Sequence, residues 1–137
     1  MVKKAKSKKY IYAVGKRKSS SARVRLYKGQ GESMVNNMSF EKYFPGSTAR
    51  MLWSRPFDLT GSLGKYFVSV KVRGGGKKGQ LEAVTHGIAK ALALAKPDKF
   101  RLILKKAGLL TRDSRVRQRR MVGTGGKARR QKQSPKR

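Results

Sequence analysis

Alternation of apolar and polar residues predicts the strands of this chain. Residues 22–28 (ARVRLYK) alternate cleanly. In residues 65–73 (KYFVSVKVR), Tyr66, Val68, Val70 and Val72 share one face, and Phe67, Ser69, Lys71 and Arg73 share the other. Residues 10–14 (YIYAV) are rich in the aromatic and β-branched side chains that favour strands. We expect each alternating strand to pack its apolar face on a core and to turn its cations outward, Arg23 and Arg25 among them.

Two polar segments predict how the first strands are connected. Residues 15–21 (GKRKSSS) lie between the first two strands and predict a cationic hairpin or bulge that contains Lys16, Arg17 and Lys18. Residues 28–32 (KGQGE) are typical of a turn, so residues 33–36 are expected to pair back as a short strand.

Capping residues and prolines predict two short helices in the middle of the chain. Ser39 is a good N-cap for a helix that runs through Phe44 and ends before a Pro-Gly pair. A second short helix is expected to be capped by Ser47 or Thr48 and to stop at Pro56, where a backbone N–H is missing.

Two longer helices are predicted towards the end of the chain, at residues 80–95 and from Pro97 to about Gly108. Both carry apolar residues at helical spacing. The residues expected to point inward are Leu81, Val84, Ile88, Ala91, Leu92 and Ala95 in the first helix and Phe100, Ile103, Leu104 and Ala107 in the second. This order of elements predicts an α+β fold, a small mixed sheet covered by helices.

The net charge of the chain predicts the class of partner that it binds. The 137 residues include 36 Lys or Arg and 6 Asp or Glu, for a net charge of +30. Self-repulsion at this charge calls for an anionic partner, and nucleic acid is the first candidate. An anionic membrane surface is a weaker alternative, because no apolar run approaches the roughly 20 residues that span a bilayer and no amphipathic cationic helix is evident.

The charge is concentrated at the two ends of the chain. Residues 114–137 hold ten Lys or Arg, no acidic residue and few apolar ones, so this segment cannot bury enough surface to fold alone. We therefore expect a basic N-terminal arm at residues 1–9, a globular RNA-binding body at residues 10–107 and an extended basic tail at residues 108–137.

The sequence offers little for catalysis, for a metal or for a cofactor. There is no Cys, which excludes disulfides and thiolate metal sites and suits a reducing cytoplasm. His86, the one His, follows Glu82 by four residues, but no nucleophile or third ligand accompanies them. Six scattered carboxylates supply no acid–base pair. We expect no enzymatic activity, no metal, no cofactor and no small-molecule substrate, and a helix-surface contact for His86.

A glycine-rich loop at residues 74–79 (GGGKKG) matches the G-x-G-x-x-G pattern of dinucleotide-binding proteins. The acidic residue expected about 20 positions later falls on Asp98, between two predicted helices, and no Walker Lys-Ser or Lys-Thr follows Gly79. Glycines before a helix still expose backbone N–H groups to an anion. With Arg73, Lys77 and Lys78 alongside, the loop favours a ribose-phosphate backbone.

Tyrosines interleaved with cations leave two interpretations open. Tyr10, Tyr12 and Tyr27 have the chemistry to stack on unpaired bases, and they also fit as ordinary sheet residues.

Three blocks of sequence resemble the small-subunit ribosomal protein S9 family of bacteria and organelles. They are GKRKSSSARVRLYKGQG at residues 15–31, VKVRGGGKKGQLEAVTHGIAKAL at residues 70–92 and LKKAGLLTRDSRVRQRRMVGTGGKARRQKQSPKR at residues 104–137. The resemblance implies a body like the second domain of ribosomal protein S5, seated in the head of the small subunit. It also implies a tail that threads through ribosomal RNA (rRNA) to the P-site tRNA.

The resemblance assigns roles along the tail. It implies that Lys136 and Arg137 contact the P-site tRNA, although Ser134-Pro135 stands here where the family has an aromatic residue and Ser. The tail residues implied to bind rRNA are Arg112, Arg115, Arg119, Arg120, Lys127, Arg129 and Arg130. The body residues expected to bind rRNA are Lys16, Arg17, Lys18, Arg23, Arg25, Arg73, Lys77 and Lys78.

The predicted function is therefore a structural constituent of the small ribosomal subunit. Its expected partners are small-subunit rRNA, P-site tRNA and neighbouring head proteins. Its expected location is the cytoplasmic ribosome, and an organellar ribosome is compatible with the same residues. The alternative from another class is a nucleoid-type DNA-compacting protein, which the charge alone permits.

Overall fold

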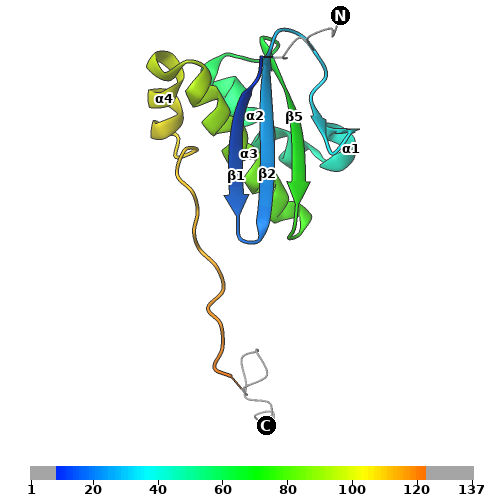
Figure 1. Ribbon diagram of the computed structural model, residues 1–137, viewed down its shortest axis with the longest axis vertical. Helices are drawn as coiled ribbons and strands as arrows, with labels where there is room; N and C mark the ends of the chain where they lie inside the picture. The colour runs from blue at the N-terminus through cyan, green and yellow to red at the C-terminus, as the bar shows by residue number, and fades with distance from the viewer. Residues whose placement is uncertain (1–8, 123–137) are drawn as a thin grey trace, which may run out of the picture.

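Five strands and four helices form a single α+β body in the computed structural model, which describes residues 9–122 (Figure 1). The strands are β1 Ile11–Arg17, β2 Ser20–Lys28, β3 Met34–Val35, β4 Met38–Ser39 and β5 Tyr66–Arg73. The helices are α1 Phe40–Tyr43, α2 Ser47–Thr60, α3 Lys77–Ala95 and α4 Pro97–Lys106. The mixed sheet covered by helices confirms the predicted fold class.

The sheet has the strand order β1-β2-β5-β3-β4, and every pair is antiparallel except β3 with β5. The predicted cationic hairpin is a tight turn at Lys18 and Ser19, where Lys18 has a positive φ of 53°. β1 therefore runs through Arg17, three residues beyond the predicted strand end.

One prediction about pairing is wrong. Residues 33–36 were expected to pair back after the turn that follows β2, but β5 occupies that edge of β2 along its whole length. β3 instead pairs with the far side of β5, in parallel, through Met34 and Val35. The long alternating strand β5 buries more apolar surface against β2 than a two-residue strand could.

Helices cover only one face of the sheet (Figure 1). α3 packs across β1 and β2, and α2 and α4 pack on α3. The core between these layers consists of the inward residues of the strands, such as Val24, Leu26, Val68 and Val70, and the inward side of α3. The opposite face of the sheet is left uncovered in the described part of the chain.

Two glycines allow α3 to approach β1 closely. A Cβ placed on Gly15 would overlap the backbone of Ala83 and Gly87. A Cβ placed on Gly87 would lie 2.6 Å from Val24 Cγ2 and 3.1 Å from Gly15 N. Helix and strand backbones are therefore in direct contact here.

α2 does not stop at Pro56, as predicted, but continues to Thr60 and ends at Gly61 in a left-handed conformation. Pro56 lacks the N–H that would donate to Leu52 O. Thr85 of α3 shares its hydroxyl between Leu81 O at 2.9 Å and Leu52 O at 3.4 Å. Because a neighbouring helix supplies a donor, the proline is tolerated inside the helix and is buried there.

The ends of the long helices differ slightly from the prediction. α3 begins at Lys77, three residues early, so the second half of the glycine-rich loop forms its first turn. In α4, Phe100 and Leu104 are buried as expected, but Ile103 is 41% exposed. Gly108 takes the expected left-handed conformation after α4, with φ 75°.

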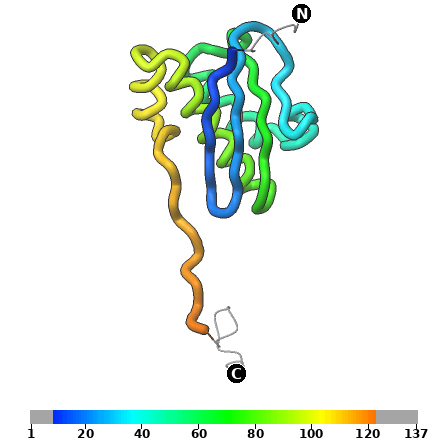
Figure 2. Tube along the Cα trace, in the orientation of Figure 1, coloured from blue at the N-terminus to red at the C-terminus, as the bar shows by residue number. Residues whose placement is uncertain are grey.

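Beyond Gly108 the described tail, residues 109–122, contains no helix or strand (Figure 2). It leaves α4 and passes the end of β1, where Arg17 contacts both Asp113 and Arg115. The tail is thus extended where it is described, while residues 123–137 lie outside the described residues.

Replacing Gly15 by Ala tests the contact between β1 and α3. Because the added methyl group meets backbone atoms that cannot rotate away, we expect a loss of about 3 kcal/mol in the free energy of unfolding, measured by urea denaturation. Gly76→Ala is the matched control, since its Cβ meets nothing within 4 Å. It should change stability by less than about 1 kcal/mol. Equal effects would contradict a tight contact at Gly15.

Candidate nucleic-acid interface

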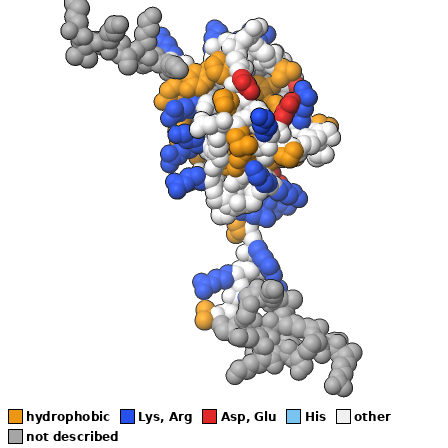
Figure 3. Space-filling model, turned by 90° about the vertical axis from the view of Figure 1, so that its right-hand side faces the viewer, with side chains coloured by type: hydrophobic (Ala, Val, Ile, Leu, Met, Phe, Trp, Pro, Cys, Tyr) orange, Lys and Arg blue, Asp and Glu red, His pale blue; other side chains and the backbone are white. Residues whose placement is uncertain are grey.

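The uncovered face of the sheet carries a cationic surface, which we call the sheet-face patch. Its members alternate outward on β1, β2 and β5 and line a hollow of about 130 Å³. They are Tyr12, Arg23, Arg25, Ser69 and Lys71. In Figure 3 blue side chains line one edge of the molecule, over this face. The structure therefore places Arg23 and Arg25 outward, as the alternation predicted.

Strand register sets like charges opposite each other in this patch. Arg23 faces Lys71 across β2 and β5, and both residues are exposed. Like charges at directly opposed positions destabilise a sheet. No described carboxylate forms an ion pair with Arg23, Arg25 or Lys71. A polyanion laid on this face would neutralise all three cations together.

Aromatic rings border the sheet-face patch. Tyr27 stacks on Phe67 at 5.0 Å between ring centroids, Tyr10 lies 5.7 Å from Tyr27, and the guanidinium of Arg25 lies 5.2 Å from the Tyr10 ring. The rings of Tyr27 on β2 and Phe67 on β5, with that of Tyr10 just before β1, thus pack on one another within the protein. Tyr12 stands apart from them in the patch and is 48% exposed.

A second group of cations gathers at the end of the β1–β2 hairpin. The hairpin turn packs on the glycine-rich loop, where Ser20 Oγ donates to Gly74 O at 3.1 Å. This packing brings the loop and the turn to one end of the sheet. The exposed cations contributed by these segments are Lys16, Lys18, Arg73, Lys77 and Lys78.

Lys77 is partly engaged within the protein itself. Its Nζ lies 3.3 Å from the centroid of the Tyr43 ring and donates to Tyr43 O at 3.2 Å. Its charge remains at the surface, next to the start of α3, where the backbone N–H groups and the helix dipole favour an anion.

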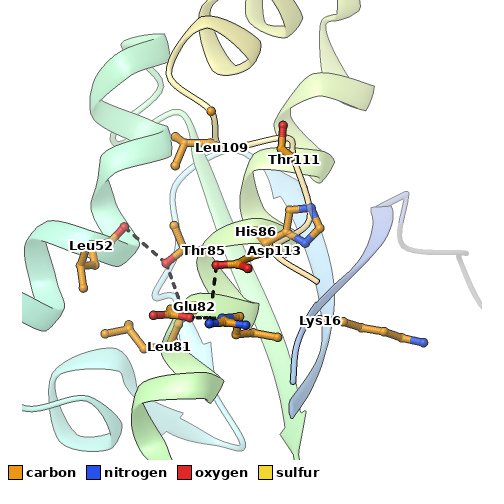
Figure 4. Close-up of a pocket in the computed structure, with 11 residues that line it drawn as sticks. Lys16, Leu52, Leu81, Glu82, Thr85, His86, Leu109, Thr111 and Asp113 are labelled. Carbon is orange, nitrogen blue, oxygen red and sulfur yellow. Dashed lines mark hydrogen bonds and ion pairs between the residues drawn. The ribbon is translucent and has the colours of Figure 1, made fainter. Parts of the chain in front are cut away.

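Arg17 has a different environment from its hairpin neighbours. It points towards the helices, its side chain is only 11% exposed, and its Nε donates to Glu82 Oε2 on α3 at 2.6 Å. Its Nη1 donates to Arg115 O at 2.6 Å, and its Nη2 lies 3.5 Å from Asp113 Oδ2. We call Arg17, Glu82, Asp113 and Arg115 the tail clamp, because these residues join the first tail residues to the body. Figure 4 labels Glu82 and Asp113, which both contact Arg17.

Within the tail clamp, Arg115 holds the carboxylate of Asp113 in place. Arg115 donates to both carboxylate oxygens of Asp113, at 2.9 and 2.8 Å, and its backbone N–H donates at 3.1 Å. These hydrogen bonds hold the pKa of Asp113 well below its usual range, so the carboxylate is ionised at neutral pH. Arg115 therefore fixes the tail locally while most of its side chain stays in solvent.

His86 supports the same junction and shows no catalytic arrangement. Its Nε2 lies 3.3 Å from Leu110 O, and burial lowers its pKa, which favours the neutral ring. Glu82, four residues earlier, pairs with Arg17 instead. Among residues 9–122 no group of three or more His, Cys, Asp or Glu could hold a metal ion, and no helix is long and apolar enough to cross a membrane.

Apart from Arg115 of the tail clamp, the tail cations predicted to bind RNA divide into two groups. Arg112, Arg119 and Arg120 are exposed along the described segment. Lys127, Arg129, Arg130, Lys136 and Arg137 lie outside the described residues. The sequence reasoning missed Lys71 as a member of the sheet-face patch, although alternation in residues 65–73 already placed it on the outward face.

Replacing Arg17 by Gln tests the tail clamp. The guanidinium donors to Glu82 and Arg115 are lost, so amide hydrogen exchange in residues 109–115 should become about tenfold faster while the sheet stays protected. Lys16→Gln removes a neighbouring exposed cation and should leave exchange unchanged. Equal exchange in both variants would show that the tail base is held by other contacts.

Comparison with known proteins identifies the family of this chain. Residues 15–137 match the family described as ribosomal protein S9/S16. The chain is 48% identical over 120 residues to the small ribosomal subunit protein uS9 of Maridesulfovibrio salexigens, covering 88% of this chain and 92% of the relative. The uS9 protein of Solidesulfovibrio magneticus gives the same identity and coverage. The chain therefore belongs to the ribosomal protein S9 family.

Proposed function

We propose that this protein is a structural constituent of the small ribosomal subunit that binds rRNA through its sheet-face patch, its hairpin end and its tail. The family consists of structural, non-enzymatic ribosomal proteins, which confirms that the chain is not an enzyme. The protein is associated with the ribosome, and we infer that this ribosome lies in the cytoplasm of the source cell or in an organelle.

The observation that carries the proposal is the unneutralised charge of the sheet-face patch. Arg23 and Lys71 face each other in register with no described carboxylate between them. Such an arrangement costs the free protein stability, and binding of a phosphate backbone offsets that cost. The patch consists of long flexible cations and one exposed tyrosine, so it suits phosphates and an occasional unpaired base more than base-edge readout.

The tail extends the same chemistry away from the body. The tail clamp fixes where it departs, and its exposed arginines then follow one another along an extended backbone. Residues 114–137 reach at most about 80 Å when fully extended, at roughly 3.3 Å per residue. We infer that Lys136 and Arg137 at the tip contact P-site tRNA, while the cations before them anchor the path in rRNA.

Neutralising Arg23 and Arg25 together tests the sheet-face patch. The double variant R23Q/R25Q should bind small-subunit rRNA more weakly, and the slope of log affinity against log salt should fall by about 1.4–1.8, from 0.7–0.9 per lost phosphate contact. Filter binding across a range of KCl concentrations measures both quantities. Thermal stability of the free protein should not fall, because a like-charge pair is removed.

The matched control for this test is K99Q/R101Q, which removes the same charge from exposed positions of α4 in the helix layer. Its salt slope should change by less than that of the patch variant. If both variants lost equal slope, the patch would be only part of a diffuse positive field, and the proposed interface would be wrong.

Deleting Lys136 and Arg137 tests the tail tip. The truncated protein should still travel with small subunits through a density gradient after a salt wash, while P-site tRNA binding weakens and its salt slope falls by at most about 1.4–1.8. Unchanged tRNA affinity and slope would exclude the tip as a contact. If the intact protein left the gradient with nuclease-sensitive DNA and never with subunits, the DNA-compacting alternative would replace the ribosomal one.

A further inference from the structure

A groove of about 440 Å³ lies on the side of the body that carries α1. It is formed by the segment after β2, the start of α1, the middle of α2 and the segment before β5. The lining residues are Gly31, Glu32, Ser33, Ser39, Phe40, Glu41, Trp53, Phe57, Leu63, Gly64 and Tyr66. Figure 3 views this side, where red acidic side chains stand among orange apolar ones, with blue basic side chains beside them.

The groove has a fixed apolar floor and an open edge. Phe40 and Phe57 are 3% exposed each, and Phe40 packs against Trp53 with 4.5 Å between ring centroids. Leu63 at the edge is 66% exposed, so much of its apolar surface faces water. Covering that surface with another apolar side chain is favourable at about 25 cal/mol per Å².

The charge of the groove is opposite to that of the protein. Its lining contains two carboxylates, Glu32 and Glu41, and no Lys or Arg, although cations outnumber acids 36 to 6 in the chain. Arg50 approaches Glu41 at 3.8 Å, but both side chains are about 70% exposed, so this ion pair is weak. Lys42 and Lys65 are exposed next to lining residues in the chain, but their side chains are not part of the lining. The charged groups that a bound segment would meet in the groove itself are therefore the two carboxylates, and screening at physiological salt weakens charges more than about 8 Å away.

From these observations we propose that the groove binds a basic segment of another protein, in which an apolar side chain enters between Phe40 and Leu63 and flanking Lys or Arg meet Glu32 and Glu41. Nucleic acid is disfavoured here because its phosphates would lie against carboxylates. The source of the segment rests on the proposed function, which supplies neighbouring proteins of the same subunit.

Photo-crosslinking in assembled small subunits tests this proposal. Leu63 is replaced by p-benzoylphenylalanine, which its exposure tolerates, and the crosslinked site is identified by mass spectrometry. We expect a crosslink to a segment of a different protein that contains Lys or Arg beside an apolar residue. The same replacement at Leu94, which is 60% exposed on α3 and outside the groove, is the control and should not give that crosslink.

The carboxylates are tested in the same assay. E32Q/E41Q in the Leu63 crosslinker protein should lower the yield of the protein crosslink by roughly two- to fivefold in moderate salt, as expected for two exposed ion pairs. D58N/D98N removes two exposed acids from outside the groove and should leave the yield unchanged.

Three results would overturn the proposal while leaving the ribosomal role intact: a crosslink to rRNA, a crosslink to a second copy of this chain, or no crosslink above the Leu94 control. An unchanged yield of the Leu63 crosslink in the E32Q/E41Q variant would also overturn the proposal, because the two carboxylates would then contribute nothing to binding. Failure of the proposed function is distinguishable, because the unmodified protein would then be absent from gradient-purified small subunits.

Discussion

Direct backbone contact between β1 and α3, at Gly15 and Gly87, sets the spacing of the two layers on which the other features depend. Because no side chain separates strand from helix there, α3 lies flat against β1 and β2 and buries one face of the sheet. The same closeness brings Glu82 within 2.6 Å of Arg17 at the end of β1. A larger spacing would remove the ion pair that positions the tail.

The cations on the two faces of the sheet therefore have different environments. On the covered face, Arg17 is nearly buried and finds Glu82, Asp113 and a tail carbonyl, so its charge is used inside the protein. On the open face, Arg23 and Lys71 have no described acid and repel each other across the strands. Arg17 and Arg23, six positions apart in a basic sequence, thus have opposite environments, and we propose a binding role only for the second.

Local patterns predicted most of the fold because they reflect local physics. Alternation identified β2 and β5, and Ser39 and Gly108 marked helix ends through their own backbone requirements. The wrong or missing predictions concern residues whose structure depends on segments far away in the sequence. Pro56 remains helical because Thr85 supplies a donor from α3, and the tail clamp depends on a contact between residues 98 positions apart, Arg17 and Arg115. The register that opposes Arg23 to Lys71 was likewise set by pairing, which no single segment contains.

The few acidic residues of this basic chain distinguish particular regions of its surface. A carboxylate repels phosphate at close range, so the places of the few acidic residues differ from the rest of the basic surface. Glu82 and Asp113 lie where the chain binds itself, at the tail clamp, and Glu32 and Glu41 line the groove on the α1 side. Since screening weakens charges beyond about 8 Å, the proposed polyanion on the sheet-face patch and the proposed basic segment in the groove would not compete with each other.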